Sequence, residues 1–129
     1  MKQLTKAEEQ IMQILWQMEK AFVKDIIVDL PDPKPAYNTV STIVRILEKK
    51  GFVGYRAYGK THEYFPLVDK KEYTRKFLRN FVNNYFSNSY KQMVSFFARE
   101  ENMTISEMEE IRRMIDMEII KSKQKTGKQ

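Results

Sequence analysis

The chain has 129 residues, of which 42% are hydrophobic and 12% aromatic, so it has room for one or two small folded domains and is too apolar to be disordered. It contains no cysteine, which excludes disulfide bonds and thiolate metal sites. The formal net charge of +6 favours an anionic partner, and no apolar run is long enough to cross a membrane. The first residues, MKQLTKAEEQ, lack the apolar core of a signal peptide, so we expect a cytoplasmic protein.

The N-terminal part of the sequence shows the pattern of two helices and a break. Thr5 and Glu8 have the spacing of a capping box, and apolar residues then repeat at intervals of three and four. This pattern predicts an amphipathic helix over residues 6–18. A second, shorter helix is expected over residues 23–30, before the proline-rich segment PDPKP interrupts the chain.

A third helix and a β-hairpin follow the break. In YNTVSTIVRILEKKG, residues 37–51, apolar side chains recur at helical spacing and Gly51 supplies the C-terminal stop. Two strand-like segments then flank a turn at Gly59 and Lys60. Three helices followed by a hairpin predict a winged helix-turn-helix, so the expected fold is mainly α with a small β-hairpin.

The C-terminal half predicts three further helices. Aromatic residues recur every four positions from Tyr73 to Tyr85, and a shorter helix is expected around residues 93–97. Ser106 and Glu109 have capping-box spacing at the start of a final amphipathic helix. We therefore divide the chain into a winged-helix domain (1–68), a C-terminal helical region (69–123) and a disordered basic tail (124–129).

These C-terminal helices carry more apolar surface than a thin helical layer can bury alone. They could fold back on the first domain, but we favour pairing of two chains, because large exposed apolar patches are uncommon in monomers. The expected interface residues are Phe77, Phe81, Met108, Ile111, Ile115 and Ile119.

The polar face of the third helix carries residue types that bind nucleic acid. Six basic residues and one acidic residue lie between positions 34 and 60. In a helix-turn-helix, the helix after the turn enters the major groove of DNA, where polar side chains bind base edges and basic ones bind phosphates. A solvated helix face would explain each residue singly, but their combination with a basic hairpin favours double-stranded DNA; the narrow major groove of RNA cannot admit a helix. Candidate base readers are Asn38, Thr39, Ser41, Thr42 and Arg45, and candidate phosphate contacts are Lys49, Lys50, Arg56 and Lys60.

An enzyme and a protein-binding module are the two alternatives to a DNA-binding protein. The only histidine, His62, is more typical of a surface or packing residue or a phosphate contact than of a catalyst, because no glycine-rich loop, carboxylate pair or metal-ligand cluster accompanies it. We therefore expect no enzymatic activity, cofactor or metal. The alternative is a winged helix that binds protein instead of DNA. Such a module should expose apolar residues on its third helix, where this sequence places small polar and basic ones.

Several segments in a fixed order resemble the penicillinase-repressor family over nearly the whole chain. They are LTKAEEQIMQILW, FVKDI, NTVSTIVRILEKKGFV, GKTHEYFP and MVSFFAREENMTISEMEEIRRMI. The resemblance implies a homodimeric winged-helix repressor that binds dyad-symmetric operators and pairs through its C-terminal helices. It also implies that repression is relieved when a membrane sensor-protease system triggers cleavage in the C-terminal region.

The sequence departs from the family pattern at two sites. The cleaved bond usually lies in an Asn-Phe-Ala context, and the matching residues here are Phe96, Phe97 and Ala98. Some relatives carry arginine in the recognition helix where this chain has Ser41, so a different operator preference is expected. The copper-responsive relatives carry a C-terminal cysteine motif, which a chain without cysteine lacks.

Overall fold

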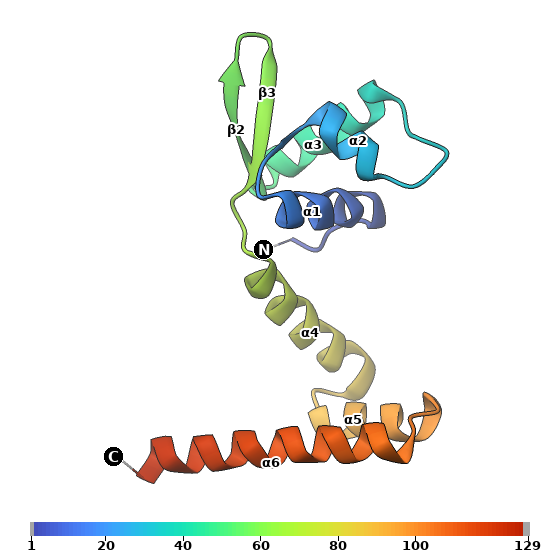
Figure 1. The fold of residues 1–129 in the computed structure, drawn as a ribbon, viewed down its shortest axis with the longest axis vertical. Helices are drawn as coiled ribbons and strands as arrows, with labels where there is room; N and C mark the ends of the chain where they lie inside the picture. Colours follow the sequence, from blue (N-terminus) through green and yellow to red (C-terminus); the bar gives the residue numbers. More distant parts are fainter. Residues whose placement is uncertain (1, 128–129) are drawn as a thin grey trace. The chain divides into compact units, whose positions relative to one another are not determined.

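The computed structural model describes residues 2–127, which form six helices and a three-stranded antiparallel sheet (Figure 1). They fall into two compact units, of which the first ends at Leu78 and the second begins at Arg79. The elements in chain order are α1 (Lys6–Met18), β1 (Ala21–Phe22), α2 (Val23–Asp29), α3 (Tyr37–Lys49), β2 (Val53–Tyr58), β3 (Thr61–Pro66), α4 (Lys70–Phe86), α5 (Tyr90–Glu100) and α6 (Ile105–Gly127).

The first unit is a winged helix-turn-helix, as the sequence predicts. Helices α1 to α3 enclose an apolar core, and the β2–β3 hairpin projects beyond them as the wing (Figure 1). The capping box of α1 is formed, because the Thr5 hydroxyl accepts a hydrogen bond from the Glu8 amide and the Glu8 carboxylate accepts one from the Thr5 amide. Gly51 and Gly59 adopt positive φ angles of 83° and 64°, which end α3 and turn the hairpin.

A short strand, β1, completes the sheet and was not predicted. Ala21 and Phe22 pair with Tyr64 and Glu63, which gives the strand order β1-β3-β2. Two residues are too few to show the alternation by which a strand is recognised in sequence. The buried side chains that join helices and sheet include Ile11, Leu15, Ile26, Val40, Val44, Leu47, Phe52 and Val53.

The first unit extends further along the chain than the expected boundary at residue 68. The Tyr73 hydroxyl, on α4, accepts a hydrogen bond of 3.1 Å from the Leu4 amide. Its ring centroid lies 5.8 Å from those of both Trp16 and Phe52. The start of α4 is therefore packed into the winged-helix core, which moves the boundary to Leu78.

The second unit contains the end of α4 together with α5 and α6. Two expectations about α6 are wrong. Thr104, and not Ser106, caps the helix, because its hydroxyl accepts from the Glu107 amide at 3.1 Å while the Glu107 carboxylate accepts from the Thr104 amide. The helix also continues to Gly127, so residues 124–127 are helical where a disordered tail was expected. Residues 128 and 129 lie outside the described part of the chain.

None of the helices within residues 2–127 is both long enough and apolar enough to span a lipid bilayer.

Candidate nucleic-acid interface

Helix α3 presents two distinct faces. Val40, Val44 and Leu47 are buried against the rest of the winged helix. Asn38, Thr42, Arg45 and Lys49, spaced four, three and four residues apart, all lie exposed on the opposite side, and Thr39 is exposed beside them. Residues at this spacing share one helix face. The structure therefore brings five of the predicted DNA-binding residues onto one solvent-facing surface.

The side chain of Thr42 is already oriented within the helix. Its hydroxyl donates a hydrogen bond of 2.8 Å to the Asn38 carbonyl, one turn earlier. This bond uses the only donor of the hydroxyl and leaves its acceptor capacity free on an exposed residue. Thr42 is thus suited to accept a hydrogen bond from a base or to contact a thymine methyl.

Ser41 does not belong to the exposed surface. Ser41 is only 9% exposed, and it lies on the same side of α3 as the buried residues Val40 and Val44. A rotation of about 100° separates neighbouring residues on a helix, so Ser41 falls toward the core while Thr42 falls outside it. The predicted role of Ser41 as a base reader is not supported by this placement.

Lys50 is engaged inside the domain. Its ammonium donates to both carboxylate oxygens of Glu8 at 2.8 Å, and the side chains of Glu8 and Lys50 are only 5% and 22% exposed. Burial by itself would raise the pKa of Glu8, but the hydrogen bonds from Lys50 and Thr5 outweigh it and hold the pKa below its ordinary value. The salt bridge ties the end of α3 to the start of α1, so this placement does not support the predicted role of Lys50 as a phosphate contact.

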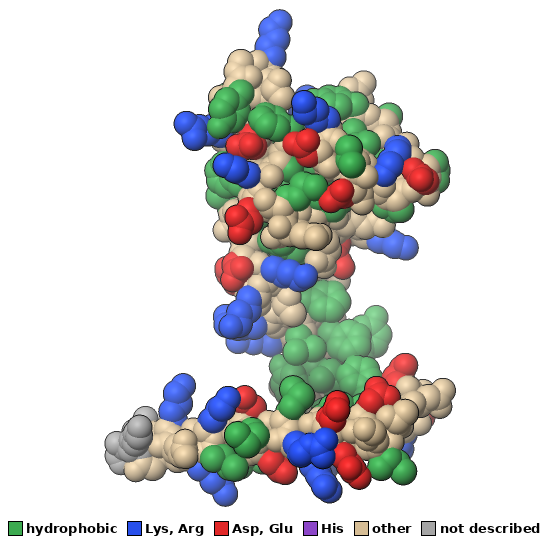
Figure 2. All heavy atoms as spheres, viewed as in Figure 1, with side chains coloured by type: hydrophobic (Ala, Val, Ile, Leu, Met, Phe, Trp, Pro, Cys, Tyr) green, Lys and Arg blue, Asp and Glu red, His purple; other side chains and the backbone are tan. Residues whose placement is uncertain are grey.

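The other predicted phosphate contacts, and the predicted base reader Arg45, keep their charges available. Within residues 2–127, Arg45, Lys49, Arg56 and Lys60 form no salt bridge. Lys60 lies in the turn of the wing, and Figure 2 shows basic side chains (blue) projecting at this tip. Arg56 lies over the ring of Tyr58, with its guanidinium carbon 5.6 Å from the ring centroid. These unpaired cations provide the positive potential that a phosphate backbone requires.

The face of the wing that packs toward the helices is aromatic. Tyr55 and His62 are stacked at a centroid distance of 4.2 Å, and both lie about 6.1 Å from Tyr64. Burial raises the pKa of the Tyr64 hydroxyl, and the Glu48 carboxylate adds to this shift while Arg45 opposes it. Helix α3 also packs against β2, so α3 and the base of the wing are neighbours.

Two exposed residues of α3 were missed by the sequence reasoning. Tyr37 is 54% exposed at the start of the helix, and Ile46 is 41% exposed beside Arg45. For Ile46 the available signal was its position off the apolar stripe formed by Val40, Val44 and Leu47, whereas Tyr37 has the spacing of that stripe and gave no such signal. An isoleucine or a tyrosine on a recognition helix can contact a thymine methyl or a phosphate, respectively. The surface of α3 is therefore less uniformly polar than the sequence indicated.

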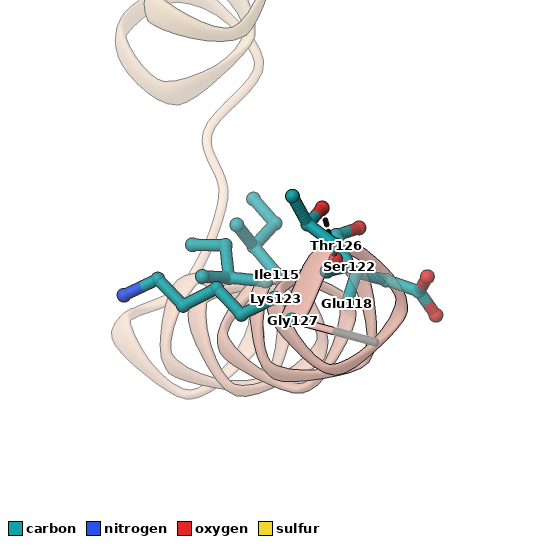
Figure 3. Close-up of a pocket in the computed structure, with 7 residues that line it drawn as sticks. Ile115, Glu118, Ser122, Lys123, Thr126 and Gly127 are labelled. Carbon is teal, nitrogen blue, oxygen red and sulfur yellow. Dashed lines mark hydrogen bonds between the residues drawn. The ribbon is translucent and has the colours of Figure 1, made fainter. Parts of the chain in front are cut away.

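The residues expected at a dimer interface lie in both units. Phe77 belongs to the first unit and Phe81 to the second. Met108, Ile111 and Ile115 line an apolar groove of about 500 Å³ between α5 and α6, and Ile119 is half-exposed further along α6. Figure 3 shows a second hollow, which Ile115 also lines. In it the Thr126 hydroxyl donates a hydrogen bond to the Ser122 carbonyl. All seven residues that line this hollow come from α6, so it is one face of an uncovered helix and not an enclosed ligand site.

The predicted cleavage residues are helical. Phe96 and Phe97 lie within α5. The ring centroid of Phe96 is 5.7 Å from that of Phe86, and Phe97 lines the apolar groove. Within the described residues, no group of three or more histidine, aspartate or glutamate side chains is arranged to hold a metal ion.

A winged helix whose third helix presents outward polar groups and unpaired cations defines a class: it is a DNA-binding protein of the helix-turn-helix type. The model of the penicillinase repressor family matches residues 4–117. The chain therefore belongs to the penicillinase repressor family, which makes it a transcriptional repressor and not an enzyme.

Individual proteins and a solved structure are also similar to this chain. The methicillin resistance regulatory protein MecI of Staphylococcus aureus (strain N315) is 27% identical over 115 residues, which cover 88% of this chain and 94% of that protein. The penicillinase repressor of Bacillus licheniformis is 22% identical, with coverage of 88% and 90%. The solution structure of the DNA-binding domain of the repressor BlaI is 25% identical, covers 55% of this chain and 88% of that chain, and superposes with a TM-score of 0.49.

Proposed function

We propose that this protein represses transcription in the cytoplasm as a homodimer on a dyad-symmetric DNA operator, with α3 of each protomer in the major groove. The observation that carries this proposal is the single exposed surface that unites Asn38, Thr42, Arg45 and Lys49. Its charges have no acidic partner within residues 2–127, so they remain available to DNA.

The surface divides into groups with different tasks. Asn38, Thr39 and Thr42 lie in the first half of α3, the part that meets base edges in helix-turn-helix proteins, and Arg45 has the geometry to bind guanine with two hydrogen bonds. Lys49 and Lys60 are flexible point charges at the end of α3 and the tip of the wing, which suits them to phosphates. Repression would follow because a dimer bound at the operator occupies DNA that the transcription machinery needs.

A salt series tests the DNA-binding part of the proposal. Fluorescence anisotropy with a labelled mixed-sequence duplex should give an affinity that falls linearly in a log–log plot, with a slope of about −0.9 for each phosphate neutralised. A winged helix that binds only protein would show no affinity for the duplex at any salt concentration.

The second unit supports the homodimer. Val82 is the only fully buried hydrophobic residue among those described beyond Arg79, and α5 and α6 have no buried residue. Figure 2 shows hydrophobic side chains (green) exposed along α4 and on α6. A soluble protomer would lose much of its stability by leaving this surface in water. A second copy supplies a matching apolar surface, because the two partners of a two-fold interface present the same residues.

Sedimentation tests the dimer. Ile111 lines the groove between α5 and α6, so Ile111→Asp would place a charge in an apolar seam. We expect the wild-type chain to sediment as a dimer at micromolar concentration and Ile111→Asp as a monomer with a folded first unit. Val28→Asp is the matched control, because Val28 is an exposed aliphatic residue on α2. A wild-type monomer, or dissociation caused equally by Val28→Asp, would contradict the proposed interface.

We also infer that cleavage between Phe96 and Phe97 would end repression, with a membrane sensor-protease system as the upstream partner. The cut would separate α6, including Met108, Ile111 and Ile115, from the winged helix without removing any residue of α3. The bond lies within the helix α5, so a protease would need to unwind this segment locally before cutting it. Incubation of the intact dimer with the protease, followed by mass spectrometry of the fragments, tests this inference.

A further inference from the structure

The wing contains an ordered imidazole that the proposed contacts do not use. His62 is stacked on Tyr55 at 4.2 Å with an angle of 10° between the ring planes, and it meets the edge of Tyr64 at 6.1 Å. The imidazole is thus held by two aromatic neighbours. Within residues 2–127 its ring nitrogens make no hydrogen bond and no salt bridge, although the residue is only partly exposed. An imidazole held in place with both nitrogens unpaired is ready for an external partner.

The position of His62 suits an anionic partner. Side chains alternate along a strand, and Tyr55, His62 and Tyr64 share one face of the hairpin. Tyr55 lies on β2, the strand that packs against α3, so this part of the hairpin adjoins the DNA-binding surface. A winged helix whose α3 lies in the major groove brings its wing against the neighbouring phosphates.

We propose that His62 binds a DNA phosphate as an imidazolium, so that each protomer takes up a proton when it binds DNA. This inference rests on the DNA-binding function proposed above. Histidine titrates near neutral pH, and a phosphate within hydrogen-bonding distance favours its charged form. The proton comes from the solvent, and in the complex both ring nitrogens of the imidazolium carry a hydrogen.

Other titratable groups around His62 set the background for this linkage. Tyr55 faces it from β2 and Tyr64 from its own strand. From α3, Tyr37, Arg45 and Glu48 act on Tyr64 and so border the same face. The flanking Glu63 points to the opposite face of the hairpin, in register with Arg56.

The test compares DNA affinity at two pH values in the full-length chain. The probe is a labelled mixed-sequence duplex at low salt, because a phosphate contact does not depend on base sequence. Uptake of one proton changes affinity by up to tenfold per pH unit. We expect the wild type to bind about fivefold more tightly per protomer at about pH 6 than at about pH 8.

Three variants test whether the pH dependence of DNA affinity comes from His62. His62→Gln should lose most of the pH dependence, and His62→Lys should restore tight binding that does not vary over this range, because lysine stays charged. Lys60→Met, the matched control in the same wing, should lower the salt dependence and keep the pH dependence of the wild type. Titration calorimetry in two buffers with different ionisation enthalpies then counts the protons, and thermal melting confirms that each variant is folded.

Equal pH dependence in the wild type and His62→Gln would overturn the role of His62 and leave DNA binding itself intact. Calorimetry that finds no proton uptake by the wild type would also overturn it. A chain that fails to bind the duplex at either pH would overturn this inference together with the proposed function.

Discussion

Two adjacent lysines are expected to respond in opposite ways to the same substitution. Lys49 is exposed and forms no salt bridge within residues 2–127, whereas Lys50 is bound to both oxygens of Glu8. Lys49→Met removes a phosphate contact, so we expect the slope of log affinity against log salt to become shallower by about 0.9 per protomer. Its effect on the free energy of unfolding should stay within about 0.5 kcal/mol, as for most surface substitutions.

The loss of stability expected for Lys50→Met follows from the hydrogen bonds that the Glu8 carboxylate loses. The Glu8 side chain is 5% exposed and accepts two hydrogen bonds from Lys50 at 2.8 Å and one from the Thr5 amide at 2.8 Å. Lys50→Met leaves this carboxylate buried with only the amide as a donor, which costs about 2–3 kcal/mol. For a unit of this size, 1 kcal/mol corresponds to a shift of about 4–8 °C in Tm, so the first unit should melt roughly 10–20 °C lower.

Differential scanning calorimetry and a salt series of fluorescence anisotropy, both on the full-length variants, measure these two quantities. We expect Lys49→Met to change the slope of log affinity against log salt without changing Tm. We expect Lys50→Met to change Tm without changing that slope. If Lys50→Met lowers the slope as much as Lys49→Met does and melts like the wild type, the salt bridge with Glu8 does not hold Lys50 away from DNA.

Three further results are expected. The pKa of Glu8 is held below its ordinary value of 4.5, so at acidic pH the folded state binds fewer protons than the unfolded state. The free energy of unfolding should therefore decrease as the pH falls below about 4.5, and Glu8→Gln should make this decrease shallower in chemical denaturation series. Tyr73→Phe leaves the Leu4 amide without its acceptor and should destabilise the first unit by about 1–2 kcal/mol in the same assay; an unchanged midpoint would contradict the packing of α4 on that unit. A fragment of residues 1–96 keeps α3 and the wing but lacks α6, so it should bind operator DNA about 100-fold more weakly than the intact chain; equal binding would show that pairing does not contribute to affinity.

The elements that local signals specify were predictable from the sequence. The capping box at Thr5 and the apolar repeat gave α1 its observed bounds, and the stripe that ends at Gly51 gave α3. The turn at Gly59 and Lys60 gave the wing. In each case neighbouring residues determine the backbone, so a window of a few residues contains the necessary information.

The remaining features depend on contacts between distant parts of the chain. Glu8 and Lys50 are 42 residues apart, so no local pattern indicates that they pair, and Lys50 was predicted to be a DNA contact. Tyr73 belongs to the first unit because of its contacts with Leu4, Trp16 and Phe52, which no local pattern reveals. Ser41 lies at the margin of the apolar stripe, where a small rotation of the helix decides whether a residue is buried.

Selection of DNA sites by the intact protein tests the central claim most directly. A random-sequence duplex pool, enriched by repeated binding to the wild-type chain, should converge on a dyad-symmetric sequence. On that sequence Arg45→Ala should lose about 1–3 kcal/mol of binding free energy and should tolerate base changes at one position of each half-site. Failure of the wild-type chain to enrich any sequence, or undiminished and equally selective binding by Arg45→Ala, would contradict the assignment of α3 as the reader of the operator.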